Sequence, residues 1–226
     1  MTNPVRVLLV DDDALVRSGL KMMLGGAETL EVVGEVNDGY GVLAAVDRHR
    51  PDVVLMDIRM PHLDGIAATR LVRRQPEPPA VIVLTTFDAD ELVVRALQAG
   101  AAGFLLKDTA PADLVRAIES VHAGEGALSP AVARRLIALV AGDSDAGAHR
   151  DEAIARMATL SAREREVAVA VAEGFSNAEI GRRLHMSLAT VKAHVSRLLT
   201  KFDVGNRVQV SLLVHEASSG LVRREQ

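Results

Sequence analysis

Short apolar runs rich in β-branched residues alternate with longer amphipathic stretches over the first half of the chain. This alternation is typical of repeated strand and helix units, in which helices cover both faces of a parallel sheet. The apolar runs predict five strands, at residues 5–10, 32–36, 53–56, 81–84 and 103–106. The other stretches predict five helices, near residues 14–24, 39–49, 64–75, 89–99 and 110–123. We therefore expect an α/β domain over residues 1–124, with a doubly wound five-stranded parallel sheet.

The length of 226 residues favours two domains, because a single domain typically has roughly 100 to 150 residues. The Ser-Pro pair that opens residues 129–140 predicts a helix there, since serine caps helices and proline suits the first helical position. Residues 141–149 are small, polar and aperiodic, which indicates a flexible linker. We assign residues 125–155 to a linker helix and flexible linker, and residues 156–226 to a second domain.

The second domain has the pattern of a series of short helices. Two of them begin with the capping-box spacing, in which a glutamate follows a serine by three residues, at 161–164 and 176–179. A third helix is expected after the turn at residues 185–187, and a fourth over about 206–215. A small all-α domain is therefore predicted.

The composition excludes several classes of protein. The chain has no cysteine, which rules out disulfides, zinc-thiolate sites and cysteine nucleophiles. It shows no signal-like N-terminus and no apolar run of roughly 18 residues, so we expect a cytoplasmic location and no membrane span. Residues 1–150 carry 15 Lys and Arg against 21 Asp and Glu, a net charge of −6, whereas residues 151–226 carry 11 against 9, a net charge of +2. The acidic part fits metal or phosphoryl chemistry, and the basic part permits contact with nucleic acid.

Polar side chains lie at the ends of four predicted strands. Residues 11–13 are three aspartates after the first strand, Asp57 ends the third, Thr85 the fourth and Lys107 the fifth. Because ligands bind beyond the carboxyl ends of the strands in a doubly wound sheet, these side chains are expected to converge. Clustered carboxylates repel one another unless they hold a hard divalent cation, for which Mg2+ is the natural choice. Asp57 could then form an aspartyl phosphate, with Lys107 and the metal neutralising the transferred oxygens and Thr85 bonding the phosphoryl group.

The segments that carry these residues resemble the receiver domain of response regulators. The resemblance covers about residues 4–123 and rests on Val10–Asp12, Leu55–Pro61 with Asp64–Gly65, Leu84–Thr85 and Gly103–Lys107. It implies a flavodoxin-like receiver fold with Asp57 as the phosphoacceptor. It also implies that Mg2+ is held by Asp11, Asp12, Asp57 and the backbone carbonyl of Arg59.

The same resemblance implies a switch around the phosphoacceptor. Thr85 is its hydroxyl, Lys107 pairs with the phosphate, and Phe104 is the aromatic whose rotamer follows Thr85. Asp13 stands where a histidine is common in the subfamily that this chain resembles. Which two of the three consecutive aspartates form the acidic pair therefore stays open.

Residues 176–201 read as two helices joined by a short turn, with a local charge of +4 from five basic residues and Glu179. Such a concentration fits contact with phosphates. On the second helix, an apolar stripe that must face the core consists of Val191, Val195, Leu198 and Phe202. The opposite face carries small or basic residues suited to a major groove: Ala189, Lys192, Ala193, Ser196, Arg197 and Thr200. Without its context, the pattern fits an ordinary amphipathic surface helix equally well.

Residues 160–167, 173–180 and 189–196 resemble the LuxR-type helix-turn-helix, and the resemblance spans about residues 157–217. Together with the receiver, the combination is similar to the NarL/FixJ class of response regulators. It implies groove contacts to double-stranded promoter DNA from Lys192, Ala193 and Ser196. Contacts near the DNA backbone are implied for Thr190, His194 and Arg197.

The predicted helix at 206–215 carries the dimerisation surface of this class, here with Val208 and Leu212. Core packing is an equal alternative for the apolar residues of this helix. Since one small DNA-binding module usually binds modestly, we expect a homodimer on DNA.

The implied function is a two-component switch, in which a sensor histidine kinase phosphorylates Asp57 and the chain dimerises and binds DNA. Such a chain catalyses only its own phosphorylation and slow dephosphorylation, so we do not expect an enzyme. An aspartyl-phosphate phosphatase would need a second aspartate two residues after the nucleophile, where this chain has Arg59. A receiver with phosphorylation-independent DNA binding, or with an interaction or RNA-binding output, remains the alternative.

Overall fold

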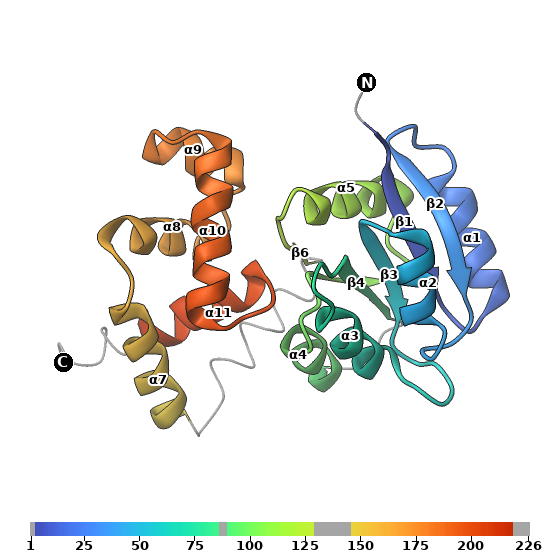
Figure 1. The fold of residues 1–226 in the computed structure, drawn as a ribbon, viewed down its shortest axis with the longest axis horizontal. Coiled ribbons are helices and arrows are strands. Elements are labelled where there is room, and N and C mark those ends of the chain that lie inside the picture. Colours follow the sequence, from blue (N-terminus) through green and yellow to red (C-terminus); the bar gives the residue numbers. More distant parts are fainter. Residues whose placement is uncertain (1–2, 86–89, 129–145, 219–226) are drawn as a thin grey trace. The chain divides into compact units, whose positions relative to one another are not determined.

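The computed structural model describes residues 3–85, 90–128 and 146–218. The chain divides into two compact units, Met1–Ala133 and Arg134–Gln226, which are drawn in Figure 1. The first unit is an α/β sandwich and the second consists of helices. The expected helix over residues 129–140 lies outside the described residues, as does most of the expected flexible linker.

The sheet of the first unit contains the five predicted strands and a short sixth one. These strands are β1 (Val5–Val10), β2 (Leu30–Val36), β3 (Val53–Asp57), β4 (Ala80–Thr85), β5 (Gly103–Leu106) and β6 (Ala127–Leu128). All pairs are parallel, and the strand order is β2-β1-β3-β4-β5-β6. Strand β6 lies within residues 125–155, the range predicted to be the linker. The sequence does not predict it, because two residues leave no periodic signal.

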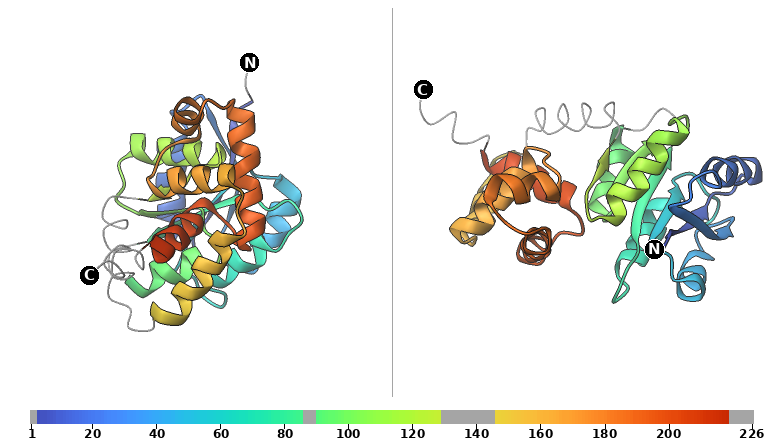
Figure 2. Two further views of the ribbon diagram at one scale, coloured as in Figure 1. Left: turned by 90° about the vertical axis from the view of Figure 1, so that its left-hand side faces the viewer. Right: turned by 90° about the horizontal axis from the view of Figure 1, so that it is seen from above.

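Helices cover both faces of this sheet. They are α1 (Ala14–Leu24), α2 (Val42–His49), α3 (Gly65–Arg73), α4 (Asp90–Gln98) and α5 (Pro111–His122). Figures 1 and 2 show α1 and α5 on one face and α2, α3 and α4 on the other. Strand β3 is buried along its whole length, as expected for a central parallel strand. The doubly wound fold is thereby confirmed.

Over residues 146–218, the second unit builds its own core from five helices. They are α7 (Ala146–Ala158), α8 (Ala162–Ala172), α9 (Asn177–Leu184), α10 (Leu188–Phe202) and α11 (Arg207–Ser218). The core includes Val167, Ile180, Leu198 and Phe202. Both predicted capping boxes are present, at the N-termini of α8 and α9. Helix α7 begins inside the segment expected to be flexible, and it contributes side chains to the core of the unit.

Gly65 marks a close approach between α3 and the end of β3. Helix α3 begins there, and its N-cap Asp64 accepts a hydrogen bond of 2.7 Å from the amide of Ala67. A Cβ atom at Gly65 would lie 1.8 Å from the backbone oxygen of Asp57. Only glycine therefore fits without moving the backbone that carries Asp57.

We predict that Gly65→Ala destabilises the first unit by about 1–3 kcal/mol, the usual range for overpacking. The matched control is Gly19→Ala in α1, where a Cβ meets nothing within 4 Å. That change is expected to stabilise by roughly 0.5–1 kcal/mol, since alanine is the better helix former. Urea unfolding of both variants measures the difference, and equal stabilities would contradict the steric argument.

Candidate functional site

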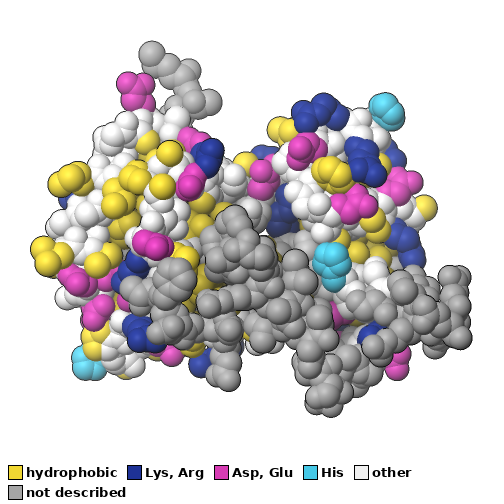
Figure 3. Space-filling view, turned by 180° about the vertical axis from the view of Figure 1, so that it is seen from behind, with side chains coloured by type: hydrophobic (Ala, Val, Ile, Leu, Met, Phe, Trp, Pro, Cys, Tyr) yellow, Lys and Arg dark blue, Asp and Glu magenta, His cyan; other side chains and the backbone are white. Residues whose placement is uncertain are grey.

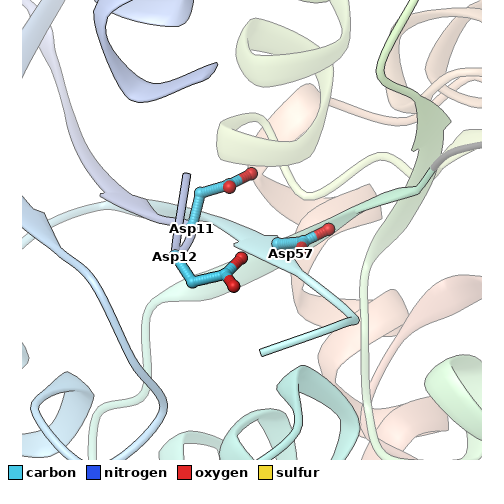
Figure 4. Close-up of side chains that lie close together, drawn as sticks. All are labelled: Asp11, Asp12 and Asp57. Carbon is cyan, nitrogen blue, oxygen red and sulfur yellow. The ribbon is translucent and has the colours of Figure 1, made fainter. Parts of the chain in front are cut away.

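Three carboxylates meet at the carboxyl edge of the sheet. Asp11 and Asp12 follow β1, and Asp57 ends the neighbouring strand β3. One oxygen from each lies within 4.8 Å of the others, and Figure 4 shows the three side chains close together. Asp11 and Asp57 are buried, whereas Asp12 is exposed.

Asp13 takes a different role from its two neighbours. Its side chain is the N-cap of α1 and accepts a hydrogen bond of 2.8 Å from the amide of Leu15. Its own amide donates to Oδ1 of Asp11 over 3.0 Å. The structure thus groups Asp11 and Asp12 with Asp57, and it uses the third consecutive aspartate to begin a helix.

Lys107 provides the positive charge of the cluster. Its Nζ lies 2.7 Å from Oδ2 of Asp11 and 3.0 Å from Oδ1 of Asp57. Burial alone would lower the pKa of Lys107, but the hydrogen bonds to both carboxylates outweigh it and hold the pKa above its ordinary value. Burial raises the pKa of Asp57, and the charge of Asp11 adds to this rise while Lys107 opposes it.

The other predicted receiver residues lie on adjoining elements. Thr85 is buried at the end of β4, and its backbone oxygen accepts a hydrogen bond of 2.8 Å from the amide of Lys107. Phe104 on β5 is 1 % exposed, so its ring is fully inside the unit. Arg59 is exposed and lies two residues beyond Asp57, in the loop that leads to α3.

The acidic cluster fits a hard divalent cation. Among the described residues, three carboxylates face the one ammonium of Lys107, which leaves an excess of negative charge at a largely buried position. Mg2+ prefers oxygen ligands and is usually bound through a few carboxylates, with its other ligands from water and substrate. The donor set therefore suits magnesium better than a metal that prefers nitrogen or sulfur.

In the second unit, α9 and α10 form a helix-turn-helix with a tight turn. His185 ends α9 in the left-handed conformation, with φ of 55°. The amide of Met186 donates a hydrogen bond of 2.9 Å to the backbone oxygen of Gly181. A Cβ atom at Gly181 would lie 2.9 Å from the backbone oxygen of Met186. Ser187 caps α10 by accepting a hydrogen bond from the amide of Thr190.

Helix α10 presents the face that was predicted to contact DNA. Its apolar stripe is buried, and five of the six predicted contact residues are exposed: Thr190, Lys192, Ala193, Ser196 and Arg197. The sixth residue, His194, is half-buried rather than exposed. Its Nδ1 atom is buried and has no hydrogen-bond partner among the described residues. In Figure 3, Lys and Arg side chains gather at the end of this unit where α9 lies.

The two residues expected at a dimer surface differ in exposure. Val208 is buried, and Leu212 is half-buried. Val210 and Leu213 on the same helix belong to the core. The burial of Val208 agrees with the core-packing alternative, whereas Leu212 retains an accessible side chain.

A buried arginine ties the helix-turn-helix to α11, and no sequence pattern pointed to it. Nη2 of Arg207 donates 2.7 Å to the oxygen of Phe175, and Nη1 donates 3.3 Å to Oδ1 of Asn177. These contacts join the N-terminus of α9 to a helix far away in the sequence. Only the fold reveals them, because arginine at a helix start ordinarily reads as a solvated residue.

The fold and the two sites define a regulator that joins a receiver to a DNA-binding unit, and comparisons with known proteins agree. The model of the response regulator receiver domain matches residues 7–119. The model of the luxR family of bacterial regulatory proteins matches residues 158–214. The chain belongs to the response regulators that carry a LuxR-type helix-turn-helix domain.

Full-length relatives narrow this assignment to the NarL and LiaR type. The chain is 38% identical to the transcriptional regulatory protein LiaR of Bacillus subtilis, over 93% of this chain and 97% of that one. It is 34% identical to the nitrate/nitrite response regulator NarL of Escherichia coli, over 94% and 96%. A solved structure of two RcsB dimers bound to two parallel DNAs matches with a TM-score of 0.55 and 25% identity, covering 95% of this chain and 99% of that one. Within the described residues, no helix is long and apolar enough to cross a membrane.

Glu164 joins the start of α8 to the end of α10. Its Oε2 accepts hydrogen bonds of 2.9 Å from the amide of Ser161 and 2.7 Å from Nζ of Lys201. The Lys201 bond and the capping bonds lower the pKa of Glu164 to about 2. This pair holds the helix that precedes the helix-turn-helix against α10.

We predict that Glu164→Gln lowers the stability of the second unit at neutral pH by on the order of 1 kcal/mol, allowing for the partly exposed Lys201. Since the folded pKa is below the unfolded one, the contribution is complete above about pH 4.5 and declines as the pH falls toward 2. Urea unfolding across this range measures it. Glu166→Gln, which affects an exposed pair with Arg163, should change stability little at any pH. A stability difference between Glu164→Gln and wild type that persists unchanged at low pH would refute the charged role of Glu164.

Proposed function

We propose that Asp57 accepts a phosphoryl group from a sensor histidine kinase, and that phosphorylation makes the chain dimerise and bind promoter DNA to regulate transcription. The observation that carries this proposal is the position of Asp57, buried at the carboxyl edge of the sheet with Lys107 at 3.0 Å and two further carboxylates beside it. The membership in the response regulator family supports it.

The transfer itself needs little beyond these residues. A carboxylate oxygen of Asp57 attacks the phosphorus of a phosphohistidine, the phosphorus–nitrogen bond breaks, and the imidazole leaves. Lys107 is placed to balance the charge on the transferred oxygens. Asp11, Asp12, Asp57 and the backbone carbonyl of Arg59 would hold Mg2+, which when bound supplies further neutralisation of those oxygens. Later attack by water returns Asp57 to its free state, so the chain acts on itself and is not an enzyme toward other substrates.

The switch would act through two neighbouring strands. Thr85 ends β4 beside Asp57 on β3, and Phe104 lies on the next strand, β5. In the proposed active state, the hydroxyl of Thr85 bonds the phosphoryl group, and Phe104 takes the space that Thr85 leaves. The buried ring of Phe104 in this structure supports such a coupling, because both side chains are in the interior.

The DNA-binding output would be α10. Lys192, Ala193 and Ser196 are proposed to contact base edges in the major groove, and Thr190, His194 and Arg197 the backbone. RcsB dimers bound to DNA support a dimer as the binding form, with Leu212 as the accessible residue of the proposed surface. We place the receiver at residues 1–124 and the DNA-binding domain at 156–226, with β6 and α7 extending them. A chain that meets a kinase and promoter DNA would act in the cytoplasm.

We predict that Asp57→Asn abolishes phosphoryl uptake from acetyl phosphate in the presence of Mg2+, because the amide is a far weaker nucleophile. Intact-mass measurement of the full chain follows the uptake. The matched control is Asp13→Asn, which keeps a good N-cap for α1 and should still be phosphorylated. Stoichiometric uptake by Asp57→Asn would overturn the site. Uptake by the wild-type chain without any change in DNA affinity would instead favour phosphorylation-independent DNA binding.

Two substitutions in α10 should weaken DNA binding in different ways. Lys192→Ala is expected to weaken the binding free energy by about 1–3 kcal/mol and to relax the sequence preference at one base pair, as for a base contact. Arg197→Ala is expected to weaken binding evenly across sequences and to reduce the salt slope by about 1, as for a phosphate contact. Salt-dependent titrations on duplexes selected from a random pool measure both. Identical effects of the two changes would contradict the proposed orientation of α10.

A further inference from the structure

Arg17 on α1 contacts both β2 and the acidic turn that follows β1. It lies one turn into α1, and its side chain is 16% exposed. Its Nη1 donates a hydrogen bond of 2.6 Å to the backbone oxygen of Asp11. Its Nε lies 3.4 Å from Oε2 of Glu35 on β2, a distance typical of an ion pair rather than a strong hydrogen bond.

The bond from Arg17 acts on the part of the backbone that positions two proposed metal ligands. Asp11 and Asp12 are consecutive, and they turn sharply from β1 into α1 within a few residues. The peptide group between them contains the backbone oxygen to which Arg17 donates. The orientation of this peptide group sets the direction in which the Asp12 side chain points. Asp12 is exposed whereas Asp11 is buried, so the direction of the Asp12 side chain depends more strongly on its backbone.

Glu35 in turn orients Arg17. It also accepts a hydrogen bond of 2.9 Å from Nζ of Lys21, and that bond is the main reason that its pKa is lowered. The carboxylate of Glu35 therefore forms an ion pair with one edge of the Arg17 guanidinium. An arginine can bond a carboxylate and a carbonyl at once because its planar donors point in several directions.

We propose that Arg17 is a positioning residue for the Mg2+ and phosphoryl site, which acts by fixing the Asp11–Asp12 peptide from α1. The inference rests on the proposed function of the acidic cluster. Outer groups that orient metal ligands typically change metal affinity by roughly 10–100-fold when they are removed. Arg17 has the contacts of such a group, because it bonds the backbone of a proposed metal ligand.

The direction of the effect separates positioning from charge. If Arg17 acted only through its positive charge, its removal would make the acidic cluster more negative and would tighten Mg2+ binding. If Arg17 acts by positioning Asp12, removing Arg17 weakens Mg2+ binding, although the loss of its positive charge by itself would strengthen that binding. The two accounts therefore predict opposite signs for one measured quantity.

The experiment compares Arg17→Met with Lys21→Met in the full-length chain. Lys21 bonds the same Glu35, but it is largely exposed and makes no contact with the acidic turn among the described residues. Calorimetric titration with Mg2+ gives the Kd, and thermal unfolding without Mg2+ gives the stability of each variant. We expect the Kd to rise roughly tenfold in Arg17→Met and to stay within twofold of wild type in Lys21→Met. Phosphorylation by acetyl phosphate should be slow in Arg17→Met at low Mg2+ and recover at saturating Mg2+.

An unchanged or tighter Kd in Arg17→Met would overturn the inference. Should that variant not fold, Arg17→Lys takes its place, since the shorter side chain keeps the charge but cannot span both partners. A tenfold loss of affinity in Arg17→Lys supports positioning, and wild-type affinity overturns it. If the wild-type chain itself binds no Mg2+, the proposed function of the cluster fails as well, which distinguishes that result from a failure of Arg17 alone.

Discussion

Carboxylates that are only a few ångströms apart repel one another, and the ammonium of Lys107 is what allows Asp11 and Asp57 to be buried together. It lies within 3.0 Å of both, and it comes from the far end of β5. Its placement depends on the parallel sheet, because only parallel strands bring the ends of β1, β3 and β5 to one edge. The sheet is thus the support for a charge arrangement that no local segment of this chain could hold.

The same reasoning explains which parts of the molecule the sequence predicts well. Strand runs, helix periodicity and the serine and glutamate caps are local signals, so their positions agreed with the structure to within a few residues. The convergence of Asp57 and Lys107 followed from the one general rule that strand ends share an edge. The receiver and LuxR-type resemblances then supplied a role for each residue, which periodicity alone could not.

Features that depend on contacts distant in sequence were not predictable. The run of three aspartates left open which two would join Asp57, because that grouping depends on a strand distant in sequence. Nothing in the sequence distinguishes the buried Arg207 from an arginine on the surface. For Glu164, the capping-box spacing predicts the capping role but not the hydrogen bond from Lys201. Val208 was equally compatible with a surface and a core, and only the packing of α11 shows that it is buried.

Helix α7 has a practical consequence for chimeric regulators, in which the DNA-binding module of one protein is fused to the input module of another. A graft starting at residue 156 would follow the motif boundary but would discard most of α7, including Ala153 from the core. The apolar face of α11 that packs against α7 would then be open to water. Such a fusion is a candidate for aggregation, and a transplantable module of this chain has to begin ahead of residue 146.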